Sequence, residues 1–168
     1  RVADTIADTK TGEAEQLIDA LAAYNNVVQG HSSELPDLSD IADLQEDAGE
    51  ERLARNVGKV VDSIQRFNDA DISRMRRCLD IIIGGQTLDL QRFGPANDSD
   101  SISSLSNEDE LDDYAYRVAG SVGEFWTSMT LAHLVRVKGE KEEKMFELGV
   151  RFGKALQLIN ILRDIPED

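Results

Sequence analysis

The chain has 168 residues, enough for one domain with its own core, and its formal net charge is -15. Such an acidic chain does not present the basic face that nucleic-acid binding requires, which excludes DNA and RNA as partners. It holds no apolar run long enough to span a membrane and one cysteine, Cys78, which cannot form an internal disulfide. We therefore expect a reducing, cytoplasmic location and a structural thiol.

The apolar residues of the N-terminal half recur at helical spacing. Residues 1–9 are typical of the end of a helix, and a second helix is predicted over residues 13–28, ending near Gly30. A proline-containing loop and a short helix over residues 40–47 follow. The periodicity then predicts one continuous helix over residues 50–67.

The C-terminal half is predicted to be helical too. Asp71 to Ser73 can cap a helix that runs past the Gly84–Gly85 pair, where a kink or a close approach is expected, and ends near Phe93. The polar segment 96–107 is expected to be a solvated loop. Asn107 and Glu110 then predict the start of a helix to residue 137, and a last helix covers 140–165. The expected fold class is all-α, a helical bundle.

Two clusters of acidic residues have a spacing that suggests metal chemistry. Asp4 and Asp8 are four residues apart and lie on one helix face, where they repel each other unless a cation such as Mg²⁺ lies between them and a phosphate. In the second cluster, one helical arc of roughly 100° contains Gln157, Asn160, Asp164, Glu167 and Asp168. The other faces of that helix are apolar, which is typical of a buried helix. A solvated face is the alternative explanation for each cluster.

These segments resemble motifs of one enzyme family. Asn160 to Asp168, preceded by Gln157, resembles the second aspartate-rich motif of the squalene/phytoene synthases. Residues 1–8 resemble the first motif, and residues 114–123 resemble the central Tyr-x-x-x-Val-Ala-Gly-x-Val-Gly segment. The three occur in the family's order. The chain begins at one metal motif and ends at the other, so we expect a single domain truncated at both ends.

The resemblance implies an isoprenoid-synthase bundle around a central cavity and a magnesium-dependent prenyltransferase. Such an enzyme joins two allylic diphosphates, here farnesyl diphosphate, through a cyclopropyl intermediate. The implied metal ligands are Asp4, Asp8, Asn160, Asp164, Glu167 and Asp168. The implied substrate-binding residues are Arg1, Gln157, Asn160, Arg163, Val118, Ala119 and Val122. The implied catalytic residues are Tyr114, Asp4 and Asp164.

Several of these residues have a simpler structural explanation. Tyr114 is equally typical of a core helix, and the small residues from Val118 to Gly123 suit helix packing as well as a prenyl-binding wall. Phe125, Trp126 and Met129 are expected in the core. Arg74, Arg76 and Arg77 are expected on a solvated face, with a phosphate contact as the alternative.

The product and even the class of protein stay open at this level. Squalene, formed with NADPH as a second cofactor, is favoured over the non-reductive products phytoene and dehydrosqualene. A non-catalytic, acidic helical protein that binds cations or a partner helix is the alternative outside enzymes. The family resemblance also allows a peripheral membrane contact. The sequence does not indicate the oligomeric state.

Overall fold

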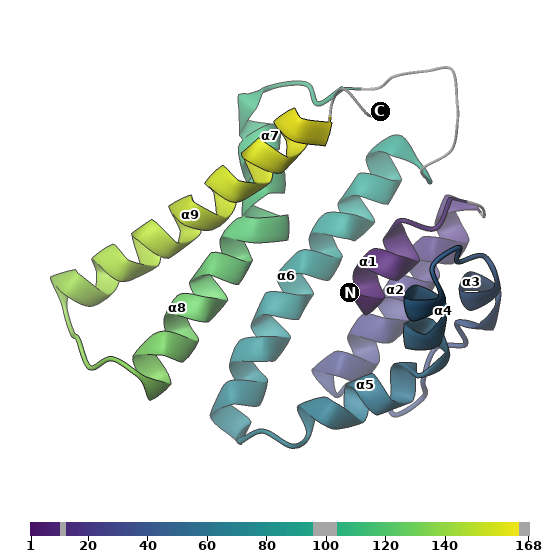
Figure 1. Ribbon diagram of the computed structural model, residues 1–168, viewed down its shortest axis with the longest axis horizontal. Coiled ribbons are helices and arrows are strands. Elements are labelled where there is room, and N and C mark those ends of the chain that lie inside the picture. Colours follow the sequence, from purple (N-terminus) through teal and green to yellow (C-terminus); the bar gives the residue numbers. More distant parts are fainter. Residues whose placement is uncertain (11–12, 96–103, 165–168) are drawn as a thin grey trace. The chain divides into compact units, whose positions relative to one another are not determined.

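The computed structural model describes residues 1–10, 13–95 and 104–164. Helices make up 77% of these residues and no strand occurs among them, so the all-α prediction is confirmed. In chain order the described helices are α1 (Val2–Ala7), α2 (Ala14–Gln29), α3 (Ser39–Asp43), α4 (Ala48–Arg55), α5 (Val57–Ile64), α6 (Asp69–Phe93), α7 (Glu108–Ala115), the π-helical η1 (Tyr116–Gly120), α8 (Ser121–His133) and α9 (Glu140–Asp164) (Figure 1).

The helices group into two compact units. Unit 1 comprises Arg1–Ile72 and Ile83–Ser103, and unit 2 comprises Ser73–Ile82 and Ser104–Asp168, so the long helix α6 contributes to both. The single domain expected from the chain length stays a prediction. No helix in the described part of the chain has the length and apolar character needed to cross a bilayer.

Unit 1 has a closed apolar core. Leu17, Leu21 and Val28 of α2 are buried at helical spacing, and α1 buries Val2 and Ile6. Helix α2 ends where Gly30 adopts φ 81°, a left-handed conformation that favours glycine. The core therefore holds α1 in place and leaves its polar face available.

The single helix expected over residues 50–67 is two helices, because the helical conformation is interrupted at Asn56. The Asn56 backbone has φ -112° and ψ 25°, and its side-chain Nδ2 donates to the Arg52 carbonyl at 2.8 Å. The apolar periodicity continues across Asn56, so the sequence pattern does not predict that a helix ends there. The Asp47 carboxylate caps the first of the two helices by accepting from the backbone N–H groups of Gly49 and Glu50.

Side-chain caps also fix the starts of α6 and α7. Asn68, rather than the expected Asp71–Ser73 segment, caps α6 by accepting from the Asp71 N–H at 3.0 Å. The helix is uninterrupted through Gly84–Gly85. Asn107 caps α7 as predicted, with Glu110 N–H as its donor at 3.0 Å. The expected loop lies largely in residues 96–103, outside the described residues.

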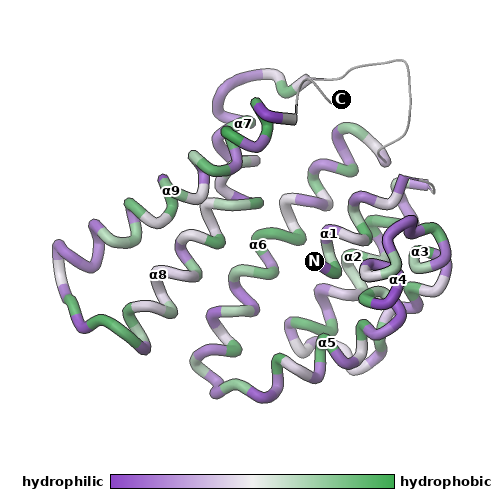
Figure 2. The backbone as a smooth tube through the Cα atoms, in the orientation of Figure 1, coloured by the Kyte–Doolittle hydropathy of each residue, from purple (hydrophilic) through white to green (hydrophobic). Residues whose placement is uncertain are grey.

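In unit 2, α8 and α9 lie side by side and run in opposite directions (Figure 1). The helix predicted from Asn107 to residue 137 is instead α7, η1 and α8, and it ends at His133. A hydrophobic segment at the end of α8 leads into the connection to α9 (Figure 2), where Leu134 is 81% exposed. Gly139 has φ 64° in this connection, which lets the chain reverse tightly.

Candidate functional site

The first acidic cluster is built on α1 in unit 1. Val2, Ala3 and Ile6 are buried, and the Thr5 hydroxyl donates to the Arg1 carbonyl at 3.0 Å. Asp4 is half-buried, and Asp8, one turn further along at the C-cap of α1, is more exposed but still partly covered. The buried face therefore turns both carboxylates to the same side of α1, as the four-residue spacing predicts.

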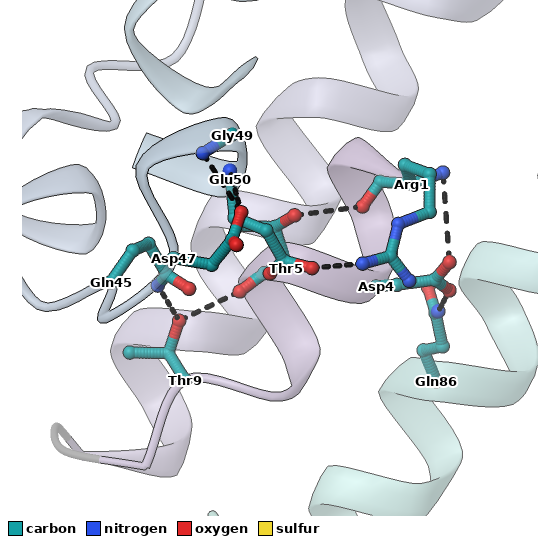
Figure 3. Close-up of polar contacts among 9 residues, drawn as sticks. All are labelled: Arg1, Asp4, Thr5, Thr9, Gln45, Asp47, Gly49, Glu50 and Gln86. Atoms are coloured by element: carbon teal, nitrogen blue, oxygen red, sulfur yellow. Dashed lines mark hydrogen bonds and ion pairs between the residues drawn. The ribbon is translucent and has the colours of Figure 1, made fainter. Parts of the chain in front are cut away.

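Asp4 is held by a glutamine that the sequence analysis did not single out. The Gln86 amide, from α6, donates through Nε2 to the Asp4 carboxylate (Figure 3). The other amide atom, Gln86 Oε1, is buried and accepts no hydrogen bond from the described residues. A buried oxygen without a protein donor is normally satisfied by an ordered water or a bound ion.

The electrostatics of this cluster disfavour further negative charge. Partial burial, followed by the charges of Asp4 and Glu50, raises the pKa of Asp8, and nearby Arg1 opposes this effect. Burial also raises the pKa of Asp89, on α6 in the same unit. The Arg1 guanidinium forms an ion pair with Glu50 (Figure 3). We define the α1 cluster as Asp4, Asp8, Glu50, Gln86 and Asp89.

The α1 cluster suits a hard divalent cation in its donor chemistry but is incomplete as a metal site. Its oxygen donors are those that Mg²⁺ prefers. Among the side chains that the structure describes, no three His, Cys, Asp or Glu groups gather closely enough to hold a metal ion. The residues present therefore fit part of a magnesium site, with the remaining ligands to come from elsewhere.

The second feature is an apolar groove in unit 2, with a volume of about 630 Å³. Five residues predicted to bind substrate meet there: Val118, Ala119, Val122, Gln157 and Asn160. The other lining residues are Gly123, Trp126, Thr127, Thr130, Met145, Gly149, Phe152, Gly153 and Leu156. The groove is therefore mostly apolar along its length and carries two amide side chains.

Glycines make the base of this groove by bringing two helices into backbone contact. A Cβ added at Gly123 would lie 2.0 Å from the Gly149 carbonyl oxygen, and one added at Gly153 would lie 2.2 Å from the Ala119 carbonyl oxygen. Small residues therefore bring the two helices together, which fits the interpretation as helix packing. Val118, Ala119 and Val122 also line the groove, which fits the interpretation as a prenyl-binding wall. The Gly149–Gly153 pair was a signal that the sequence analysis missed.

The central motif segment contains the π-helical turn η1. Such turns often occur at functional sites because they shift the side chains that follow. The Tyr116 hydroxyl donates to Glu124 at 2.9 Å, and Lys154 from α9 lies 5.9 Å from the Tyr116 ring centre. Burial and Glu124 raise the Tyr116 pKa. Tyr114, the predicted catalytic residue, is partly buried at the end of α7 and does not line the groove.

The second aspartate-rich motif lies at the carboxyl end of α9. Asn160 lines the groove and Arg163 is exposed. Asp164 is the last residue of α9, and nothing is described of its side chain. Glu167 and Asp168, both predicted metal ligands, lie outside the described residues. How the two motifs lie relative to each other stays a prediction.

Two expectations about unit 2 are wrong. Trp126 is not a core residue, because its side chain lines the groove and the residue is 63% exposed. The last turns of α9 are not buried, because Ile159 is 61% and Leu162 is 68% exposed. The apolar pattern of α9 therefore marks surface that the described residues leave uncovered.

The other side of α8 carries structural contacts. Arg74 donates to the Ser128 hydroxyl at 3.0 Å, and Arg77 pairs with Glu124 at 2.7 Å, so these two arginines are more than a solvated face. Cys78 is buried against the Ser121 carbonyl, as a structural thiol should be. Burial raises the pKa of the Cys78 thiol to about 11.

Comparison with known proteins supports one family over the whole chain. A family model described as squalene/phytoene synthase matches residues 1–168. The bifunctional lycopene cyclase/phytoene synthase of Neurospora crassa is 32% identical over 76 residues. That match covers 45% of this chain and spans only 13% of the Neurospora protein. No solved structure matches the chain significantly.

Proposed function

Because this chain belongs to the squalene/phytoene synthase family, we propose that it is the catalytic part of a prenyltransferase. The proposed enzyme condenses two allylic prenyl diphosphates head to head and releases diphosphate. The proposal names farnesyl diphosphate as the substrate and a cyclopropyl compound as the intermediate.

The groove of unit 2 is the observation that carries this proposal. Its small and apolar residues, such as Val118, Ala119 and Val122, suit a hydrocarbon chain, and its two amides suit a polar head. Asn160 lies one helical turn before Asp164, so the polar part of the groove leads toward the aspartate-rich motif. A prenyl diphosphate has the same distribution of polarity.

A diphosphate approaching this end of the groove meets a negative environment. Helix α9 ends at Asp164, and a helix carboxyl end has a partial negative charge. Within unit 1, the α1 cluster carries the carboxylates of Asp4, Asp8, Glu50 and Asp89. Bound Mg²⁺ would supply the positive charge that diphosphate binding and departure need. The residues proposed to hold it are Asp4, Asp8, Asn160, Asp164, Glu167 and Asp168.

The remaining polar residues have proposed roles in binding and proton transfer. Arg1 and Arg163 donate charge-assisted hydrogen bonds to phosphate oxygens. Arg1 would exchange its present ion pair with Glu50 for this contact. Gln157 orients the substrate, and Tyr114 assists proton removal or steers the carbocation. These roles follow from the family resemblance.

Squalene is the proposed product, made with NADPH as the reductant, on the resemblance of the segment Tyr114 to Trp126. Phytoene-type, non-reductive chemistry is the second candidate, because the Neurospora relative has phytoene synthase in its name. Incubation of the protein with farnesyl diphosphate and Mg²⁺, with and without NADPH, separates the two by product analysis. A squalene synthase gives squalene only when NADPH is present. Dehydrosqualene in both incubations would support the second candidate.

Binding measurements distinguish an enzyme from a cation-binding protein. An enzyme should bind Mg²⁺ and an unreactive farnesyl thiodiphosphate cooperatively, and Asp164→Ala should abolish the coupling. Asp62→Ala, at an exposed position of α5, is the control. A magnesium affinity that does not change when the analogue is added would refute the proposed enzymatic function. A cytoplasmic location with peripheral membrane contact completes the proposal and is tested by fractionation.

A further inference from the structure

The groove of unit 2 is long, and its two ends differ in chemistry. It is lined by a stripe from Val118 to Thr130 on η1 and α8 and by a facing stripe from Met145 to Asn160 on α9. At 1.5 Å per residue, the α9 stripe extends over about 22 Å. Because α8 and α9 are antiparallel, Gln157 and Asn160 lie at one end, and Thr130 and Met145 lie at the other.

The base of the groove cannot deepen to admit a bulkier ligand. The Gly123, Gly149 and Gly153 backbones already touch the opposite helix, as the distances of 2.0 to 2.2 Å for an added Cβ indicate. A ligand is therefore accommodated along the groove rather than into its base. A longer ligand therefore reaches the side chains at the end remote from Asn160.

Trp126 forms part of the groove wall close to that remote end. It lies one helical turn before Thr130 on the same face of α8, and both line the groove. Its ring packs edge-to-face against Phe125, with ring centres 5.5 Å apart and planes at 61°. Such a pair restrains the indole orientation. Met145, an adaptable side chain, faces this wall from α9.

We propose that Trp126, Thr130 and Met145 set the longest prenyl chain that the enzyme accepts. This inference rests on the proposed function, which fixes the diphosphate at the Asn160 end. The hydrocarbon chain then runs toward the amino end of α9, and its last isoprene unit meets these three residues. Each added isoprene unit therefore needs space that Thr130 and Met145 occupy.

Binding of unreactive geranyl, farnesyl and geranylgeranyl thiodiphosphates, with Mg²⁺ present, tests the proposal without catalysis. Trp126 is the one tryptophan of the chain, so its fluorescence reports binding in variants that retain it. Thr130→Leu should weaken geranylgeranyl binding about tenfold or more and leave geranyl binding unchanged. Met145→Ala should have the opposite effect and improve binding of the longest analogue. Leu134→Ala, at an 81% exposed position outside the groove, is the control and should change neither.

The outcomes separate this inference from the proposed function. If the unsubstituted protein binds none of the three analogues, the proposed function is wrong. If it binds them but Thr130→Leu and Met145→Ala shift all affinities equally or not at all, only the length-setting role is wrong. If Thr130→Leu fails to fold, the Met145→Ala variant decides alone, because a smaller side chain adds no steric conflict.

Discussion

The α1 cluster and the groove of unit 2 differ in what they bury and in what they expose. In unit 1 the apolar side chains of α1 are buried, and on its polar face partial burial together with the charges of Asp4 and Glu50 raises the Asp8 pKa. In unit 2 the described residues bury only Cys78 and Ala115 among apolar side chains, while Trp126 and Phe152 are exposed along the groove. The α1 cluster presents charged side chains over a well-packed core, whereas the groove is an apolar surface formed by two helices in backbone contact. Substitutions of the charged residues in the α1 cluster should therefore damage function, and substitutions at the glycine contact of unit 2 should damage folding.

Removing the Asp4 charge should have the largest effect on activity. Asp4→Asn keeps an oxygen that accepts from Gln86 but deletes a proposed magnesium ligand. We expect turnover to fall by about 10²-fold or more, as for loss of one electrostatic contact to a transition state. The melting temperature should hold or rise, because Asp8 loses a repulsive neighbour. Steady-state kinetics and thermal unfolding measure the two quantities.

Asp62→Asn, at an exposed position of α5, is the control for Asp4→Asn. It removes the same charge from the chain outside the α1 cluster and should leave both quantities unchanged. A large drop in melting temperature for Asp4→Asn would show that the α1 cluster is structural, and the contrast between the two regions would fail.

The glycine contact in unit 2 should show the opposite pattern. Gly123→Ala places a Cβ 2.0 Å from a main-chain oxygen, which cannot rotate away, so α8 and α9 must separate. Overpacking of this kind costs about 1–3 kcal/mol, occasionally more. It should exceed the gain of about 1 kcal/mol that alanine brings to a helix. Urea unfolding should therefore reveal a destabilised protein.

Gly120→Ala is the matched variant for the glycine contact. Its added Cβ would first meet side-chain atoms of Tyr116 at 3.0 Å and Lys154 at 3.2 Å, which can rotate. We expect a clearly smaller loss of stability than for Gly123→Ala. Equal losses would mean that the helices are not held by backbone contact at Gly123.

The sequence predicted the fold class, and five of its candidate substrate-binding residues line one groove, for identifiable reasons. The apolar period of Leu17, Leu21 and Val28 marks α2 because burial on one face needs that spacing. The motif resemblance brought Val118, Ala119 and Asn160 together as candidates, and they line one groove. The metal arrangement between the two motifs stays a prediction, since the Asp164 side chain and residues 165–168 are not described.

Features that depend on particular side-chain contacts or on tertiary partners could not be predicted from the sequence. At the break between α4 and α5, the Asn56 side-chain amide donates to the Arg52 carbonyl, while the apolar periodicity continues through it. Gly149 and Gly153 are one turn apart, but their meaning depends on which helix lies opposite. Gln86 and Asp89 lie on α6, and only packing within unit 1 brings Gln86 to Asp4.

Asp89 offers a finer test of the negative charge in the α1 cluster. Burial raises its pKa, with Arg92 opposing, so ionisation of Asp89 costs folding free energy. That cost is absent below the ordinary value of 3.8 and grows as the pH rises through the folded-state pKa. Asp89→Asn should therefore raise the melting temperature at pH 7 but not at pH 3. It should also raise severalfold the magnesium concentration for half-maximal activity.

The exposed Asp19 of α2 provides the control for Asp89. Asp19→Asn should leave the melting temperature and the magnesium requirement unchanged at both pH values. A lower melting temperature for Asp89→Asn at pH 7 would mean that Asp89 stabilises unit 1 and is no part of a strained acidic surface.

Cys78 gives the smallest effect and reports on the best-buried part of unit 2. Its folded-state pKa of about 11 lies above the ordinary value of 9.0, chiefly because of burial. The protonated thiol thus favours the folded state below pH 9, and this contribution is lost as the pH rises through 11. Thiolate is the reactive form, so a thiol reagent at pH 8 should modify the native protein far more slowly than the urea-unfolded chain. Rapid native modification would mean that α6 and α8 separate readily, and that unit 2 lacks even this small closed core.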